Sequence, residues 1–239
     1  AASDVYKRQW YDKPASYWEE ALPVGNGRIA AMVFGDPQLE QIQLNEETVS
    51  AGSPYQNYNE EAKTALPEMR RLIFEGKYEE AQNMAATKIL SQVGNEMPYQ
   101  TVGRLNIRYQ DHKKVNNYYR DLDISNAVAV TRYEVDGVEF TEETFASFTD
   151  QLVIRHIKAS KPGAINCELF FNPPMRDPKR SIYGKKGLRL EGITHGSRYF
   201  PGKVHYCADL DVKHKGGKVI TANDTLPVSY THLRAHETK

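Results

Sequence analysis

Two neighbouring segments near the N-terminus decide the fold, LPVGNGRIAAMVFG at Leu22–Gly35 and LEQIQLNEETVSAGSP at Leu39–Pro54. The apolar run Arg28–Phe34 follows a Gly-Asn-Gly bend, and a short GDPQ turn separates it from the second run. Short apolar runs bounded by Gly, Pro and Asn are typical of β-strands. We therefore predict two strands, the second of which ends in the polar cluster Asn45–Thr48.

Alternation of apolar and polar residues dominates the second half of the chain, as in the runs around Leu105 and Tyr206. A period of two is typical of strands with one solvated face. Between Ala127 and Phe140, the pair Asp136-Gly137 separates two such runs, and this pair favours a two-residue hairpin turn. Further strands are expected at Gln151–Lys158, Ile165–Phe171, Leu188–Ile193 and Lys218–Thr221. The pattern predicts a mainly β fold, an antiparallel two-sheet β-sandwich of the supersandwich kind.

A short helical insertion interrupts the strands at about residues 59–90, where apolar residues recur at spacings of three and four. This period is typical of amphipathic helices, which we expect to pack on a sheet. Asn59 can accept hydrogen bonds from the first turn, Pro67 is expected to restart the helix, and Gly76 can end the middle segment. The insertion is thus predicted to be several short helices.

Composition excludes several classes of function. The chain carries 31 basic and 31 acidic residues without a basic stripe, so we expect no nucleic-acid partner. No apolar run approaches the ~20 residues needed to span a bilayer, so we expect no membrane partner. Cys167 and Cys207 are interpreted as buried thiols in preference to a disulfide bridge.

Both termini read as translated sequencing-adapter DNA, DVYKRQ at Asp4–Gln9 and VSYTHLRAHET at Val228–Thr238. We therefore divide the chain into an adapter-derived tail at 1–9, a single β-sandwich domain at 10–227, and a second adapter-derived tail at 228–239. His232 and His236 have the spacing of metal ligands on a helix. We nevertheless expect a disordered tail there, and assign no metal site and no cofactor.

Five segments carry a resemblance to a known family: the LNEET region, PEMRRLIFEGKYEEAQ from Pro67, the strand entry from Pro98 to Arg108, YYRDLDI from Tyr118, and FASFTDQLVIRHIKASKPG from Phe145. In this order they resemble the N-terminal domain of glycoside hydrolase family 95, the α-L-fucosidases. The resemblance implies a non-catalytic β-sandwich severed from a longer enzyme that removes terminal L-fucose from glycans with inversion, or acts on the related L-galactose.

The resemblance also implies the partners of this domain. In the family an α/α-barrel catalytic domain follows the β domain in the same chain and carries the catalytic acid, so we assign no catalytic residue here. The expected partners are that missing barrel and a glycan substrate. The family suggests a secreted or periplasmic enzyme, although the sequence leaves the compartment unknown. The alternative function is a stand-alone carbohydrate-binding β-sandwich module that acts through exposed aromatic side chains.

Candidate substrate-binding residues at the expected domain interface are Asn45, Glu46 and Thr48, which follow a strand end, with Tyr99 and Gln100 as a similar group. Amide and carboxylate groups of this kind bind sugar hydroxyls. The alternative is that Asn45 and Thr48 bond the turn backbone while Glu46 pairs with a surface arginine.

Glycosidases need two carboxyl groups that flank one bond. The adjacent pairs Glu46-Glu47 and Glu142-Glu143 lie in or beside strands, where successive side chains point to opposite faces. We therefore predict that neither pair converges on a substrate.

Overall fold

The computed structural model describes residues 7–52, 56–91, 97–174, 176–196, 201–220, 225–230 and 232–238. Residues 1–6, Thr221 and Lys239, for which the sequence analysis makes predictions, lie outside the described residues.

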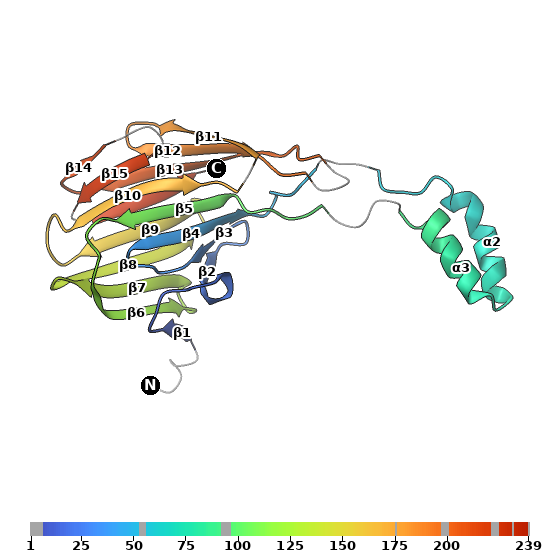
Figure 1. The fold of residues 1–239 in the computed structure, drawn as a ribbon, viewed down its shortest axis with the longest axis horizontal. Helices are drawn as coiled ribbons and strands as arrows, with labels where there is room; N and C mark the ends of the chain where they lie inside the picture. The colour runs from blue at the N-terminus through green and yellow to red at the C-terminus, as the bar shows by residue number, and fades with distance from the viewer. Residues whose placement is uncertain are drawn as a thin grey trace.

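The described strands form two antiparallel sheets that face each other (Figure 1). The sheet of nine strands has the order β1 (Arg8–Tyr11), β6 (Val115–Asp123), β7 (Val128–Val135), β8 (Val138–Ser147), β9 (Leu152–Ala159), β16 (His232–Thr238), β13 (His205–His214), β12 (Gly187–Ile193) and β11 (Arg176–Tyr183). The sheet of seven has the order β14 (Lys218–Val219), β15 (Thr225–Tyr230), β10 (Ile165–Asn172), β5 (Gly103–Tyr109), β4 (Leu39–Glu46), β3 (Ile29–Val33) and β2 (Leu22–Gly25). The prediction of a mainly β, two-sheet sandwich is confirmed.

The core lies between the two sheets and follows the period of two seen in the sequence. In β10 the buried positions alternate from Ile165 to Phe171, and in β4 Ile42 and Leu44 are buried while their neighbours are partly exposed. Successive side chains on a strand point to opposite faces, so each strand supplies one inward-facing series. This geometry determines which polar side chains can enter the interior.

The turn between β7 and β8 is the two-residue hairpin that the sequence predicts. Val135 pairs with Val138, and both turn residues have left-handed backbone angles, with φ of 49° at Asp136 and 72° at Gly137. Asp and Gly tolerate this conformation, which matches the twist of the flanking strands. The hairpin sets the register of two strands in the nine-stranded sheet.

The helical insertion consists of α2 (Ala62–Phe74), α3 (Tyr78–Met84) and the π-helical turn η2 (Ala85–Ile89). A single 3₁₀ turn, η1 (Trp18–Glu20), lies near the N-terminus. Gly76 separates α2 from α3 with a φ of 77°, as predicted. The prediction for Pro67 is wrong, because α2 begins at Ala62 and continues through the proline.

The expected packing of the helices on a sheet is also wrong, since the hairpin of α2 and α3 stands away from the sandwich (Figure 1). Leu72 and Ala81 are the buried residues of the two helices, which pack against each other. The apolar stripe that the sequence shows therefore serves contact between helices. Phe74 and Tyr78, at the turn of the hairpin, are 88% and 69% exposed.

Described residues of both predicted tails take part in the sheets. Arg8 and Gln9, assigned to the first tail, belong to β1 and pair with Asp123 and Leu122 of β6. The disordered tail expected at the C-terminus is wrong for residues 228–230, whose backbone pairs with β10, and for residues 232–238, whose backbone pairs with β9 and β13. His232 and His236 thus lie on a strand and lack the helical spacing of a metal site. The adapter origin of both tails stays a prediction.

Candidate functional site

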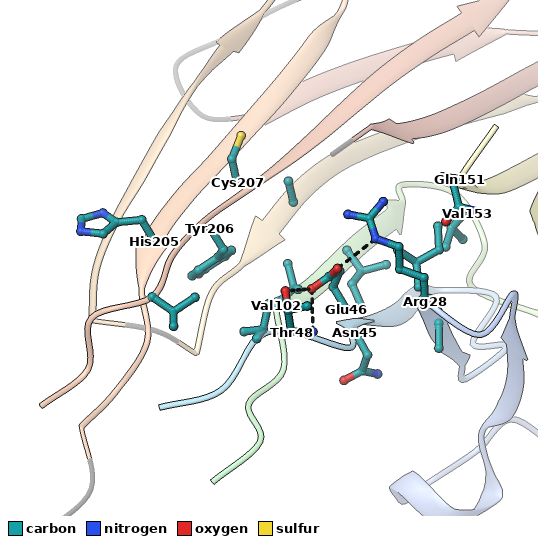
Figure 2. Close-up of a pocket in the computed structure, with 16 residues that line it drawn as sticks. Arg28, Asn45, Glu46, Thr48, Val102, Gln151, Val153, His205, Tyr206 and Cys207 are labelled. Carbon is teal, nitrogen blue, oxygen red and sulfur yellow. Dashed lines mark hydrogen bonds and ion pairs between the residues drawn. The ribbon is translucent and has the colours of Figure 1, made fainter. Parts of the chain in front are cut away.

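At one end of the sandwich, the side chains that point inward from several strands change from apolar to polar. Glu46 follows Leu44 on β4, and Gln151 precedes Val153 at the start of β9. On β13 the series Val212, Leu210, Ala208 ends in Tyr206. Together with Arg28, these side chains line a cavity of about 220 Å³ between the sheets (Figure 2).

Glu46 links Arg28 to the Thr48 turn along one wall of this cavity. Its Oε1 accepts a hydrogen bond from Arg28 Nε at 3.2 Å, and its Oε2 accepts from the Thr48 backbone N–H at 2.9 Å and from the Thr48 hydroxyl at 2.6 Å. The Asn26 side-chain oxygen accepts hydrogen bonds from the backbone N–H groups of Arg28 and Ile29 at 3.1 and 3.0 Å. These bonds hold the Gly-Asn-Gly bend that precedes β3. Figure 2 shows Arg28 and Glu46 directed at each other, with Tyr206 across the cavity.

Asn45 lies on the opposite face of β4 from Glu46, as the alternation of side chains requires. It contributes to a shallow hollow together with Glu47 and Tyr99. Tyr99 is 55% exposed, and its backbone bridges to Ser50. Partial burial raises the pKa of the Tyr99 hydroxyl, and the Glu46 carboxylate adds to the increase.

Gln100 is turned toward another loop. Its side chain donates to the backbone carbonyl of His195 at 2.8 Å and accepts from the His195 N–H at 2.8 Å. Both ends of the amide are therefore engaged with protein backbone. The structure thus brings Asn45, Glu46, Thr48 and Tyr99 to one end of the sandwich, whereas Gln100 holds the loop that precedes β13.

Sequence reasoning missed Arg28, Gln151 and Tyr206 as members of this site. A signal for two of them is present in the sequence, because each ends an apolar inward-facing series with a polar or aromatic residue. The proximity of Arg28 to Glu46 depends on the register of β3 against β4, in which Ile29 pairs with Glu46.

A second polar group lies in the middle of the sandwich, sealed between the sheets. Arg155 of β9 pairs with Glu40 of β4 at 2.6 Å and with Glu142 of β8, and it donates to the Thr144 hydroxyl at 2.6 Å. These four side chains are at most 1% exposed. The cluster is thus an ionic bridge between the two sheets.

Further hydrogen bonds surround the two carboxyl groups of the cluster, whereas Arg155 Nε is buried without a hydrogen-bond partner. Tyr109 and Tyr133 donate their hydroxyls to Glu142 Oε1 at 2.7 and 2.6 Å, and the Gly35 N–H donates to Glu40 Oε1 at 2.8 Å. Burial raises the pKa of Glu40 to about 7, although the positive charge of Arg155 acts in the opposite direction. The guanidinium of Arg155 carries one positive charge and can balance only one of the two carboxylates. The buried carboxyl of Glu40 is therefore protonated at a higher pH than an ordinary glutamate.

The acidic pairs behave as predicted from strand geometry. Glu142 is buried in the cluster, whereas the side chain of Glu143 lies on the outer face of the sheet and pairs with His156 at 3.3 Å and Lys158 at 3.7 Å. Glu46 faces inward and Glu47 is exposed. Neither pair therefore places two carboxyl groups on one substrate.

Cys167 and Cys207 are free thiols, the first buried and the second partly exposed. Within the described ranges, no group of three or more His, Cys, Asp or Glu side chains is arranged to hold a metal ion. The helices described here are all too short or too polar to cross a bilayer.

Comparison with known families identifies the domain. Residues 9–237 match the family described as glycosyl hydrolase family 65, N-terminal domain. The chain belongs to this family. The expected likeness to fucosidases is also found, since a 162-residue stretch is 40% identical to "Alpha-L-fucosidase 2" of Arabidopsis thaliana, covering 66% of this chain and 19% of that protein.

Two fungal proteins are further relatives of this family 65 N-terminal domain. "Probable alpha-fucosidase A" of Aspergillus niger is 27% identical over 64% of this chain and 20% of its own length. The protein of the same description from Aspergillus oryzae is 25% identical over 63% of this chain and 21% of its own length. The chain thus spans about a fifth of the length of these curated relatives.

Proposed function

We propose that this chain is the non-catalytic N-terminal β-sandwich of a longer α-L-fucosidase of glycoside hydrolase family 95. The observation that carries the proposal is that the inward-facing carboxyl groups are committed to structure. Glu40 and Glu142 are sealed around Arg155, and Glu46 binds Arg28 and the Thr48 turn. The cavity beside Glu46 contains no second carboxyl group among its lining residues.

The domain would act next to an α/α-barrel catalytic domain of the same chain, with a glycan as substrate of the whole enzyme. Asn45 and Tyr99, on the outer face beside the strand end, are the groups that we propose for the rim of that catalytic site. Their exposure supports this role, because loops held by a rigid sheet commonly carry binding groups. The similarity to three fucosidases supports the substrate class.

The test is hydrolysis of 4-nitrophenyl α-L-fucoside by the purified chain. A domain without paired carboxyls should release nitrophenol no faster than buffer, because acid and base catalysis both need a positioned group. The matched control is the Glu46→Gln variant. Hydrolysis by the unaltered chain that disappears in the variant would overturn the proposal and make Glu46 catalytic.

A stand-alone carbohydrate-binding module is the second candidate, favoured by exposed aromatic side chains near the N-terminus. Trp10, Tyr17 and Trp18 are 61%, 57% and 50% exposed, and aromatic faces of this kind can stack on sugar rings. Titration of the same purified chain with a fucosylated oligosaccharide distinguishes the candidates. Heat of binding that is lost in Trp18→Ala would favour the module, and no heat would favour the structural domain.

A further inference from the structure

Gln151, the last residue of the turn between β8 and β9, has a backbone conformation that is unusual for its residue type. Its φ is 57°, in the left-handed region. Residues other than Gly, Asn and Asp rarely occupy this region, because their Cβ atom crowds the backbone there. A glycine would form the same turn without strain, so the turn itself does not account for the glutamine. Backbone strain of this kind is common at binding sites.

The side chain of Gln151 brings an unsatisfied acceptor to the cavity between the sheets. Its Nε2 group donates a hydrogen bond to the Phe148 carbonyl at 2.7 Å. Its Oε1 atom is buried and accepts no hydrogen bond from a described residue, although Gln151 lines the cavity. A buried acceptor is stabilised only when a donor reaches it. This atom therefore indicates a ligand group that can donate.

Arg28 supplies free donors to the same cavity. Its Nε group is occupied by Glu46, whereas its two terminal nitrogens donate no hydrogen bond to a described residue. Figure 2 shows the guanidinium end of Arg28 directed into the cavity, toward the side on which Tyr206 lies. Glu46 thus orients the guanidinium and leaves its outer edge available. The side chain of Arg28 is 38% exposed, so solvent reaches the cavity at this end.

The charge and chemistry of these groups select the class of ligand. The charges of Arg28 and Glu46 balance each other, so the pair offers no net charge to an anion. A hydroxyl group can accept a hydrogen bond from Arg28 and donate one to Gln151, whereas a carboxylate can only accept. A neutral molecule with several hydroxyls therefore matches the two side chains.

The remaining walls match the apolar face of a sugar ring. Leu44, Val102 and Val153 line the cavity together with the ring of Tyr206, and the C–H groups of a sugar can pack on such surfaces. The volume of about 220 Å³ is below the ~300 to 1,000 Å³ of pockets for drug-sized ligands. The cavity thus suits a single ring better than an oligosaccharide.

We propose that this cavity binds one neutral monosaccharide unit. Arg28 donates hydrogen bonds to hydroxyls of the sugar, Gln151 Oε1 accepts one, and the ring of Tyr206 lies against the C–H face. Glu46 is a positioning residue, which acts through Arg28. The proposal goes beyond the non-catalytic role of the domain, and it rests on the relatives only for the choice of L-fucose as the probe.

The test is a titration of the full chain with L-fucose, followed through its amide proton–nitrogen NMR spectrum. We expect saturable shifts of the Gln151 side-chain amide and the Val153 backbone N–H, with a Kd on the order of 1 mM for a ligand of this size. Binding this weak gives little heat, so the result is separate from the oligosaccharide titration. The spectrum does not depend on hydrolysis, so the result is also separate from the fucoside assay.

Gln151→Gly is the decisive variant, because it removes the acceptor and relieves the backbone strain. Its affinity for L-fucose should fall at least ~10-fold, whereas its melting temperature should stay unchanged or rise. Arg28→Met should lose affinity to the same extent, and Trp18→Ala, outside the cavity, should keep it.

Two results would refute the sugar site. One is the absence of saturable shifts in the unaltered chain, and the other is an affinity in Gln151→Gly equal to that of the unaltered chain. Shifts produced by acetate and not by L-fucose would assign the cavity to an anion and would equally contradict the proposal.

Discussion

Among the arginine–glutamate pairs that bridge strands of this sandwich, the pair of Arg155 with Glu40 and the pair of Arg28 with Glu46 have different surroundings. Arg155 and Glu40 are 1% and 0% exposed, and Arg155 also pairs with Glu142, which accepts hydrogen bonds from two tyrosines. Arg28 and Glu46 are 38% and 18% exposed and border an open cavity. The effect of such a pair on stability therefore depends more on its burial than on the pairing itself, because water can replace a lost partner only at the open site.

The largest expected effect follows removal of the buried cation. Arg155→Met leaves Glu40 and Glu142 facing each other without a counter-charge, which should lower the free energy of unfolding by about 3 to 5 kcal/mol. Urea unfolding at pH 7 measures the change. Arg28→Met is the matched control, and its expected cost is at most about 1 kcal/mol. Equal losses in the two variants would contradict the comparison.

The second expected effect is a dependence of stability on pH that originates in Glu40. Its pKa of about 7 in the folded protein exceeds the ordinary value of 4.5, so between these values the folded state binds more protons than the unfolded state. The stabilisation that Glu40 contributes is complete below pH 4.5 and is lost as the pH rises through 7. The free energy of unfolding falls by about 3 kcal/mol at most over this range.

Unfolding curves at pH 5 and pH 8 test this dependence. Glu40→Gln keeps a neutral side chain of the same shape and should reduce the difference between the two pH values. Glu46→Gln, at the open pair, should leave it unchanged. A wild-type protein that becomes more stable from pH 5 to pH 8, with the same slope in Glu40→Gln, would show that the carboxyl of Glu40 is ionised throughout.

The smallest expected effect belongs to the open pair. Glu46→Ala removes one partly exposed ion pair and the bonds to the Thr48 turn, which should cost about 0.5 to 1 kcal/mol. Thermal and urea unfolding both measure it, with Thr48→Val as the variant that keeps the ion pair. A loss above ~3 kcal/mol would mean that Glu46 is as deeply embedded as Glu142.

Much of the fold could be predicted from local pattern. The period of two marked most of the strands, and Asp136-Gly137 marked a hairpin because few residue pairs accept its backbone angles. The helical stripe of the insertion was predicted as well, but its packing partner was not. An apolar stripe shows that a face is covered, and says nothing about whether a sheet or another helix covers it.

The site was predicted only in part because its geometry depends on non-local register. Asn45, Glu46 and Thr48 follow a strand end in the sequence, and that position can be read locally. Arg155 meets Glu40 across 115 positions of sequence, through the packing of two sheets. A polar residue at an inward-facing position indicates an interior network, but its partner becomes evident only once the strands are paired.

The junction of the helical insertion has an evolutionary consequence. The chain leaves and re-enters the sandwich at one place, where the Ala51 N–H donates to the Pro98 carbonyl at 2.9 Å and Ser50 bridges to Tyr99. No residue of α2 or α3 belongs to the apolar core cluster of the described residues. Insertions of other lengths or shapes can therefore replace these helices during divergence without a change in the packing of the core.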